Sequence, residues 1–377
     1  LKIADIGVNH DSAILIKTDQ FTFFNQNDCK IFDRLSELNE HIDFYSVQFS
    51  GANAHPSTFV FPEQKRNKIS KEKVKNKLNN VLKALKILKP SYFLPAAGPA
   101  IFPFLDPSLS MGENNIFIHQ EYLKDFLQKN NINNILFLKP GQHIKSTYKK
   151  AIPTPTLKDI DLYKIEIKNT WTELNPKLNR NTLEKVINYK LSKIKDINIS
   201  DSPILIFNYS GFFNDKDKSI NNKLFIDLNR KILLGNFDYL SNFMEIISSE
   251  RYFNLMCTER WQSVSLSLQA KVVVKPDIFN NDVNIFLFSD TSNIRSNFLK
   301  TKDIKEDRII VQTKDSRCFK VNKYCPHQNA NLSVAEINHE NQLVCPAHSW
   351  KFDLNNKGID VKSNMSINAE EIDTDIN

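Results

Sequence analysis

Two short phrases near the end of the chain hold the residue types best suited to chemistry. Cys325 and His327 stand in a Cys-Pro-His sequence. After an interval of 17 residues, Cys345 and His348 stand in a Cys-Pro-Ala-His sequence. Two thiolates and two neutral imidazoles can hold a [2Fe–2S] cluster in which one iron takes both cysteines and the other both histidines. The four residues therefore indicate one-electron transfer, at a potential raised by the imidazole ligands.

A Cys2His2 zinc site uses the same ligand types and is the alternative. Zinc sites tend to take two cysteines from one loop and two histidines from another, whereas each loop here supplies one of each. Each cysteine precedes a proline, Pro326 or Pro346, which fixes φ and removes a backbone donor beside the ligands. Residues 349–353 alternate in a way that predicts a strand returning to a small β-core. We therefore expect the iron–sulfur cluster.

The pair of phrases resembles the ligand loops of Rieske domains in ferredoxins and oxygenases. Asn329 and Ser349 depart from that pattern, because the family usually has glycine at both positions. Asn tolerates the left-handed backbone conformation, so we expect the first loop to form. The loops contain no additional cysteine pair. The resemblance therefore implies the low-potential, soluble kind of Rieske protein rather than the respiratory kind.

Composition limits the other classes of function. The chain has 377 residues and a net charge of +7, with lysines concentrated between residues 65 and 77. No aromatic residues interleave with that basic stretch, so we expect a solvated helix face and no nucleic-acid partner. No apolar run of about 18 residues occurs, so we expect no membrane span. Cys29, Cys257 and Cys318 are too scattered for a disulfide framework, which favours the reducing cytoplasm.

Alternating patterns upstream predict an α/β layer structure. We expect a β-hairpin at 11–28, strands at 44–49, 92–95 and 135–138, and helices at 70–88 and 119–129. Further along, we expect a Pro/Thr/Lys connector from about 150 to 175, helices at 181–195 and 220–250, and strands at 203–208 and 264–275. Short strands at 308–313 and 318–321 should carry the ligand loops.

The first half resembles one known kind of domain through the order of several phrases. These are His10-Asp11-Ser12-Ala13, Asn27-Asp28-Cys29, Gln48-Phe49-Ser50-Gly51-Ala52, Pro95-Ala96-Ala97-Gly98-Pro99 and Pro140-Gly141. They are similar to the metallo-β-lactamase-fold domain of the CMP-N-acetylneuraminate hydroxylase and UDP-N-acetylmuramate hydroxylase-like families, which join it to a Rieske domain. The resemblance implies a partial metallo-β-lactamase-like α/β sandwich at 1–150, a mixed α/β connecting region at 151–295 and an all-β Rieske domain at 296–377.

The resemblance also implies a second metal site, but not all of its ligands are in this chain. The His-x-His-x-Asp-His loop of that fold is absent from the sequence. We expect it upstream of Leu1; the alternative is a degenerate, metal-free domain. His10 and Asp28 match the later histidine and the carboxylate ligand, although each could equally belong to a surface turn. His55, His119 and His143 match no motif and are expected to be structural.

By resemblance, the chain is the electron-delivering part of a Rieske-dependent monooxygenase that hydroxylates the N-acyl group of a nucleotide-linked amino sugar. Its cofactors would be the [2Fe–2S] cluster and a mono- or dinuclear iron site in the metallo-β-lactamase-like domain. Its partners would be O2, the small-molecule substrate, and a ferredoxin- or cytochrome-type electron donor with its reductase. Two alternatives remain: a metallo-β-lactamase-fold hydrolase with a regulatory Rieske domain, and a pure electron-transfer protein.

Overall fold

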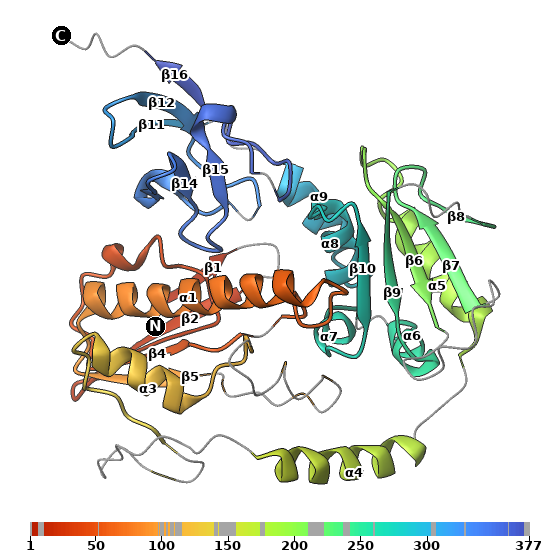
Figure 1. Cartoon of the computed structure of the whole chain (residues 1–377), viewed down its shortest axis with the longest axis horizontal. Coiled ribbons are helices and arrows are strands. Elements are labelled where there is room, and N and C mark those ends of the chain that lie inside the picture. Colours follow the sequence, from red (N-terminus) through yellow and green to blue (C-terminus); the bar gives the residue numbers. More distant parts are fainter. Residues whose placement is uncertain are drawn as a thin grey trace.

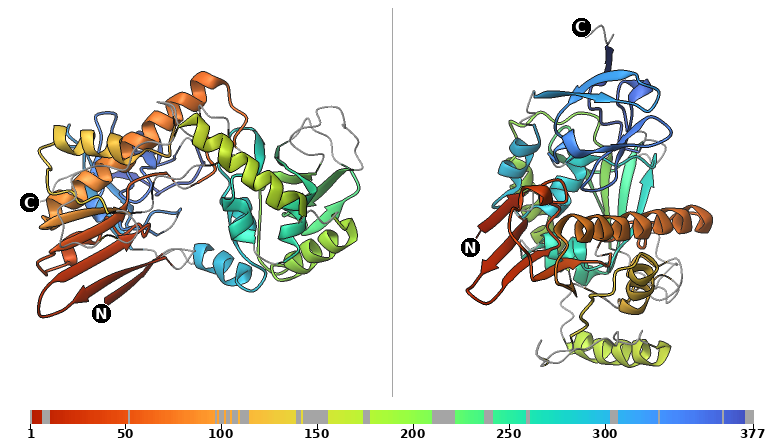
Figure 2. Two further views of the ribbon diagram at one scale, coloured as in Figure 1. Left: turned by 90° about the horizontal axis from the view of Figure 1, so that it is seen from below. Right: turned by 90° about the vertical axis from the view of Figure 1, so that its left-hand side faces the viewer.

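The chain forms three units, which we call the N-terminal, central and C-terminal units (Figure 1). The computed structural model describes residues 2–6, 11–51, 53–96, 98, 102, 105, 109, 115–138, 142, 156–173, 178–209, 222–236, 242–258, 261–302, 307–327, 329–360 and 362–372. The C-terminal unit lies over α1 of the N-terminal unit in two perpendicular views (Figures 1 and 2). None of the helices in these ranges is both long and apolar enough to cross a bilayer.

The N-terminal unit is built on a five-stranded sheet in the order β1-β2-β3-β4-β5. Its strands are β1 (Lys2–Ile6), β2 (Asp11–Lys17), β3 (Thr22–Asn27), β4 (Phe44–Gln48) and β5 (Tyr92–Ala96). The first three pair antiparallel, whereas β4 pairs parallel with both β3 and β5. A short 3-10 helix, η1 (Leu35–Glu37), lies between β3 and β4. The expected hairpin and both parallel strands are thus present.

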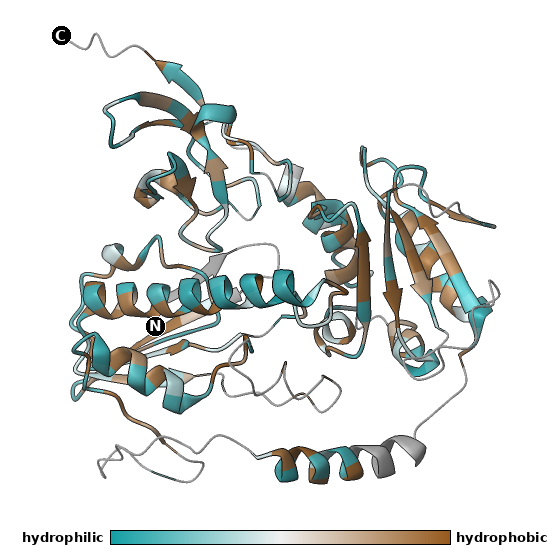
Figure 3. Ribbon diagram, viewed as in Figure 1, coloured by the Kyte–Doolittle hydropathy of each residue, from teal (hydrophilic) through white to brown (hydrophobic). Residues whose placement is uncertain are grey.

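Two helices pack on this sheet, α1 (Glu63–Leu88) and α3 (Gln120–Lys129). Leu78, Val81 and Leu85 of α1 join a buried cluster with Tyr45 and Phe93 of the sheet. Figure 3 shows the hydrophilic side of α1 facing away from this core. The helix α1 begins seven residues earlier than the apolar periodicity predicted, because its first two turns are polar and show no such periodicity. These turns follow Pro62, whose fixed φ suits the start of a helix. The Ile135 region, expected as a strand, makes an isolated bridge to Phe93.

The central unit has a second five-stranded sheet, in the order β10-β9-β6-β7-β8. Its elements are α4 (Leu157–Glu173), α5 (Arg180–Ser192), β6 (Ile204–Asn208), β7 (Lys223–Asp227), β8 (Ile232–Leu234), β9 (Phe243–Ile247), α6 (Glu250–Met256), α7 (Trp261–Leu266), β10 (Lys271–Lys275), α8 (Asn281–Phe288) and α9 (Ile294–Lys302). Its core gathers aromatic rings: the Phe207 centroid lies 5.1 Å from that of Phe253 and 5.9 Å from that of Trp261. Backbone hydrogen bonds from Val272 to Thr58 and from Val60 to Val272 join β10 to the N-terminal unit.

Three sequence predictions in the central unit are wrong. The connector expected at 150–175 contains α4, and the helix expected at 220–250 is replaced by β7, β8 and β9. The strand expected at 264–275 begins only at Lys271, after α7. The apolar run Leu224–Ile226 is buried on both faces, and a continuous apolar run of that length does not distinguish a central strand from a helix.

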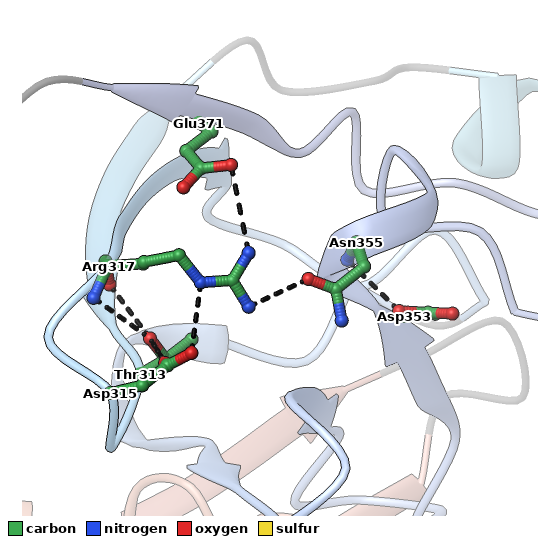
Figure 4. Close-up of polar contacts among 6 residues, drawn as sticks. All are labelled: Thr313, Asp315, Arg317, Asp353, Asn355 and Glu371. Carbon is green, nitrogen blue, oxygen red and sulfur yellow. Dashed lines mark hydrogen bonds and ion pairs between the residues drawn. The ribbon is translucent and has the colours of Figure 1, made fainter.

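The C-terminal unit consists of two three-stranded antiparallel sheets, β11-β12-β16 and β13-β14-β15. Their bounds are β11 (Arg308–Gln312), β12 (Cys318–Asn322), β13 (Glu336–Ile337), β14 (Gln342–Val344), β15 (Lys351–Asp353) and β16 (Glu370–Ile372), with the 3-10 helices η3 (Leu332–Val334) and η4 (Leu354–Asn356). Arg317 ties the sheets together (Figure 4), since its guanidinium donates to Asp315 at 3.0 Å and to Asn355 at 2.9 Å and lies 3.8 Å from the Glu371 carboxylate. The expected strands at 308–313 and 318–321 are confirmed within a residue.

Candidate metal centre

Two loops of the C-terminal unit share one backbone arrangement. In the first, the Cys325 N–H donates to the Ala330 carbonyl at 2.9 Å, and the Asn329 N–H donates back to the Cys325 carbonyl at 2.8 Å. In the second, which joins β14 to β15, Cys345 donates to Trp350 at 2.8 Å and receives from Ser349 at 2.9 Å. The two loops therefore present their cysteine and histidine side chains from equivalent backbone frames.

Both loops turn through a left-handed residue at the same step. Asn329 has φ of 55° and Ser349 has φ of 58°. These are the two positions at which the resemblance led us to expect glycine, which is the residue that adopts this conformation without steric cost. The expectation that the first loop would form with asparagine is confirmed, and serine adopts the same conformation in the second.

The four ligand candidates meet in like pairs. The Cys325 and Cys345 thiols, each 1% exposed, lie within hydrogen-bonding distance of each other. The His327 and His348 rings lie edge to face with centroids 4.8 Å apart. Within the described ranges, no three His, Cys, Asp or Glu side chains surround a single point as the ligands of one ion would. Paired sulfurs beside paired imidazoles fit a two-iron cluster better than a single zinc ion.

The environment favours the protonation states that metal ligands need. Burial lowers the pKa of His327 to about 4. Burial, and then the nearby charges of His327 and three lysines, holds the pKa of His348 well below its usual value. The hydrogen bond from the Cys325 thiol, and then the backbone of His348 and Ala347, lowers the pKa of Cys345 against the effect of burial. The site therefore favours neutral imidazoles at His327 and His348 and an easily formed thiolate at Cys345.

Each histidine also keeps one ring nitrogen unsatisfied. The Nδ1 atoms of His327 and His348 are buried and have no hydrogen-bond partner among the described residues. A buried nitrogen without a partner costs about 1–3 kcal/mol. A bond from each Nδ1 to iron would remove that cost, so the donor set fits the cluster.

Two aromatic side chains cover the histidine side of the site. Trp350 stacks on His327 with ring centroids 4.3 Å apart and planes 11° apart. Phe279, from the segment before α8, lies edge-on to both, with centroids at 5.5 Å from His327 and 5.2 Å from Trp350. No sequence pattern singles out Phe279, because it lies 48 residues before His327 and belongs to the central unit.

The N-terminal unit contacts both ligand loops. The Asp33 carboxylate, just before η1, accepts a hydrogen bond from the Asn331 N–H at 2.9 Å. From α1, the Asn80 amide donates to the Pro346 carbonyl at 3.5 Å. Farther out, Lys83 pairs with Glu336 at 2.9 Å and Glu72 with Lys362 at 3.7 Å. The candidate cluster therefore lies at a junction between units.

The proposed second metal site is less defined. Asp28 lies exposed in the turn after β3, and within the described ranges it belongs to no group of three or more His, Cys, Asp or Glu side chains that could hold a metal ion. His10 and His143 lie outside the described residues. His119 is buried at the start of α3, and His55 packs against Phe59 with ring centroids 4.8 Å apart. A role for Asp28 and His10 as ligands stays a prediction.

Comparison with known proteins agrees with the geometry of the two loops. Residues 284–369 match the family described as the Rieske [2Fe–2S] domain. The chain carries a Rieske domain. A Rieske domain indicates a [2Fe–2S] cluster as its cofactor. The matched range includes Cys325, His327, Cys345 and His348, and their role as the ligands of that cluster stays a prediction. The match begins within α8, earlier than the predicted boundary at 296.

Relatives of the Rieske domain occur among curated proteins. A putative Rieske 2Fe–2S iron–sulfur protein of Mycobacterium tuberculosis is 26% identical over 139 residues, which are 35% of this chain and 27% of that protein. Cholesterol 7-desaturase nvd of Drosophila melanogaster is 38% identical over 47 residues, 12% of this chain and 11% of that protein. Cholesterol 7-desaturase nvd 1 of Ciona intestinalis is 26% identical over 135 residues, 36% and 26% respectively.

The matched part of the chain thus spans about a quarter of the mycobacterial relative's length. No solved structure matches the chain. The metallo-β-lactamase-like fold of the first half therefore stays a proposal.

Proposed function

We propose that this chain is an oxidoreductase, the electron-delivering part of a monooxygenase in which the Rieske domain serves a site on the N-terminal unit. The observation that carries the proposal is the contact of both ligand loops with that unit. Asp33 holds the first loop at 2.9 Å, and Asn80 reaches the second at 3.5 Å. Electron transfer weakens steeply with distance, so a fixed junction favours delivery into the neighbouring unit.

The protein's own residues would hold the cluster and orient the two ligand loops. When bound, the [2Fe–2S] cluster supplies reversible one-electron transfer. Cys325 and Cys345 would hold one iron, and His327 and His348 the other. Trp350 and Phe279 restrict the approach of water to His327, and Asp33 and Asn80 fix the loops against the N-terminal unit.

The substrate proposal rests on the resemblance of the first half to nucleotide-sugar hydroxylases. We propose that O2 and two electrons convert an N-acyl C–H bond of a nucleotide-linked amino sugar to C–OH, with two protons taken up and one water released. His10 and Asp28 are the proposed ligands of iron in the N-terminal unit. Asp28 lies close enough to Lys77 for its charge to act on that lysine, whose charge in turn acts on His348.

Oxygen consumption tests this proposal. Purified protein with its cluster, a ferredoxin and its reductase should consume O2 only when CMP-N-acetylneuraminate or UDP-N-acetylmuramate is present, and mass spectrometry should find one added oxygen atom in the product. The Cys345→Ser variant is the matched negative control. Reduction and reoxidation of the cluster without substrate-dependent O2 uptake would leave an electron-transfer protein and overturn the monooxygenase.

The likeness to cholesterol 7-desaturases favours a second candidate, an oxidoreductase acting on a sterol-like ring system. An apolar substrate needs an apolar pocket. The charges of Lys30, Lys73 and Lys77 instead act on His348 and help to hold its pKa below the usual value. Cholesterol offered in the same assay should therefore leave O2 uptake at its background rate.

A further inference from the structure

The central unit supplies an aromatic side chain to the histidine side of the candidate cluster site. Phe279 lies edge-on to His327, with ring centroids 5.5 Å and planes 88° apart, and edge-on to Trp350 at 5.2 Å and 82°. It stands between β10 and α8, whereas both of its ring partners belong to the C-terminal unit. The residues matched by the Rieske family begin at 284, so Phe279 lies outside the matched domain.

The short segment that carries Phe279 is fixed to all three units. Before it, Asp277 forms an ion pair with Lys65 of α1 in the N-terminal unit. At Phe279 itself, the backbone N–H donates to the Lys362 carbonyl of the C-terminal unit at 2.8 Å. Directly after it, the Asn280 side chain caps α8 of the central unit by accepting from a backbone N–H at 2.9 Å. The phenyl ring is therefore held in place by polar contacts on both sides of it.

Phe279 completes an aromatic enclosure around His327. Trp350 stacks on the imidazole, His348 meets it edge to face, and Phe279 packs against it from another unit. Among the ring contacts of His327 in the described part of the chain, only the one with Phe279 comes from outside the C-terminal unit. His327 is only 9% exposed. The burial of this ligand candidate is thus shared between two units.

An apolar cover of this kind affects a reduction potential. In a cluster held by two thiolates and two neutral imidazoles, the thiolates balance the charge of the oxidised core, so one added electron leaves a net negative charge. Water stabilises a net charge and apolar surroundings do not, so apolar surroundings oppose reduction. A phenyl ring that keeps water away from His327 therefore favours the oxidised form.

We propose that Phe279 is a positioning residue of the cluster site, through which the central unit holds the His327 ring and lowers the reduction potential of the cluster. Phe279 acts through His327 and does not itself bind the cluster. The central unit thereby takes part in setting the potential of a cofactor for which it supplies no predicted ligand. The proposal needs His327 to be a cluster ligand, but it does not need the chain to be a monooxygenase.

Redox titration of the cluster-containing protein, followed by visible absorption and electron paramagnetic resonance, tests this role. Phe279→Ala should keep the signal of the reduced cluster and raise the midpoint potential, because water then reaches His327. The substitution changes no charge, so the shift reports access of water and not a new Coulomb interaction. Phe279→Val should raise the potential by less, and it serves as the test if Phe279→Ala loses its iron.

Ile278→Ala is the matched control. It truncates the neighbouring apolar side chain of the same segment, which is half-buried like Phe279. Both alanine variants should lose stability in urea titration, because each removes buried apolar surface. Only Phe279→Ala should change the midpoint potential, since a residue that merely packs would lower the stability and leave the potential unchanged.

Three results would overturn the role of Phe279. One is a wild-type potential in the Phe279 variant that keeps its signal. Another is an equal shift in Ile278→Ala and Phe279→Ala. The third is an unchanged spectrum in His327→Cys, which would remove His327 from the ligands and the proposal with it. Absence of substrate-dependent O2 uptake would refute the monooxygenase and leave the role of Phe279 standing, so the two failures are distinguishable.

Discussion

The Asp33 carboxylate accepts a hydrogen bond from the backbone N–H of Asn331 at 2.9 Å, across 298 residues of sequence. Asp33 follows the strand β3 of the N-terminal unit, and Asn331 closes the first Rieske ligand loop. Burial raises the pKa of Asp33, and the Asn331 N–H opposes that rise. The contact therefore fixes a half-buried carboxylate and the loop at the same time.

Removing this carboxylate should loosen the junction. Asp33→Ala removes the acceptor, and a hydrogen bond to a charged group contributes about 1.5–3 kcal/mol. We expect faster hydrogen–deuterium exchange across residues 329–334, with the cluster retained. Asp19→Ala, which changes an exposed aspartate of the same unit, is the control. Equal exchange in both variants would mean that the Asp33 contact does not hold the loop.

Substitution with serine should distinguish the cysteines that bind the cluster from those that do not. Cys345→Ser replaces a thiolate ligand and should abolish the visible cluster absorption and most of the bound iron. Cys318→Ser changes a thiol that is also buried, at 7% exposed, but stands in β12 outside the ligand loops. It should keep wild-type iron and sulfide. Loss of iron in Cys318→Ser but not in Cys345→Ser would refute the ligand assignment.

Glycine at the left-handed position of the second loop should stabilise the protein. A non-glycine residue in this conformation costs about 1–2 kcal/mol, and Ser349 has φ of 58°. Ser349→Gly should therefore raise the free energy of unfolding by about 1 kcal/mol in urea titration, less any gain in unfolded-chain entropy. Ser333→Gly, in η3, should not stabilise. A destabilised Ser349→Gly protein would show that the serine side chain contributes more than its backbone strain costs.

Acid should destabilise the fold partly through His55. Burial, followed by the charges of Lys73, Lys362 and Lys65, lowers the pKa of His55 from 6.5 to about 3. Between these values the unfolded chain binds a proton that the folded chain does not. The His55 contribution is therefore fully present above pH 6.5 and is lost as pH falls towards about 3, at no more than about 1.4 kcal/mol per pH unit.

The His55→Gln variant isolates that contribution. Urea titrations of variant and wild type should show a shallower fall in stability for His55→Gln over the same pH range, whereas other acid-sensitive groups act equally in both. Parallel pH profiles would mean that His55 is protonated in the folded protein.

The ligand loops could be predicted from the sequence because the residue types of each loop are close together in the chain. Cys325 and His327, like Cys345 and His348, are close neighbours in the chain, and Asn329 could be recognised as a residue that tolerates the left-handed turn. The residues around them could not be found in this way. Asp33 and Phe279 reach the loops only through tertiary packing, and nothing in their own surroundings in the sequence indicates it.

The same distinction applies to the fold. The hairpin of β2 and β3 and the apolar stripe of α1 follow from local periodicity, so their prediction succeeded. The residues of β7 and β9 were predicted as helix because a buried central strand loses the alternation that identifies strands at a surface. The lysines of α1 were expected to be solvated, but Lys73 and Lys77 are half-buried and donate to the His55 carbonyl and the Gln48 side chain, which no helical pattern reveals.

Electron paramagnetic resonance of the dithionite-reduced protein tests the central claim most directly. With two imidazoles from His327 and His348 on one iron, the brown protein should give a rhombic signal whose average g value lies below that of the free electron. His348→Cys should shift the spectrum towards that of an all-cysteine ferredoxin. A colourless protein that contains zinc and gives no signal would contradict the account.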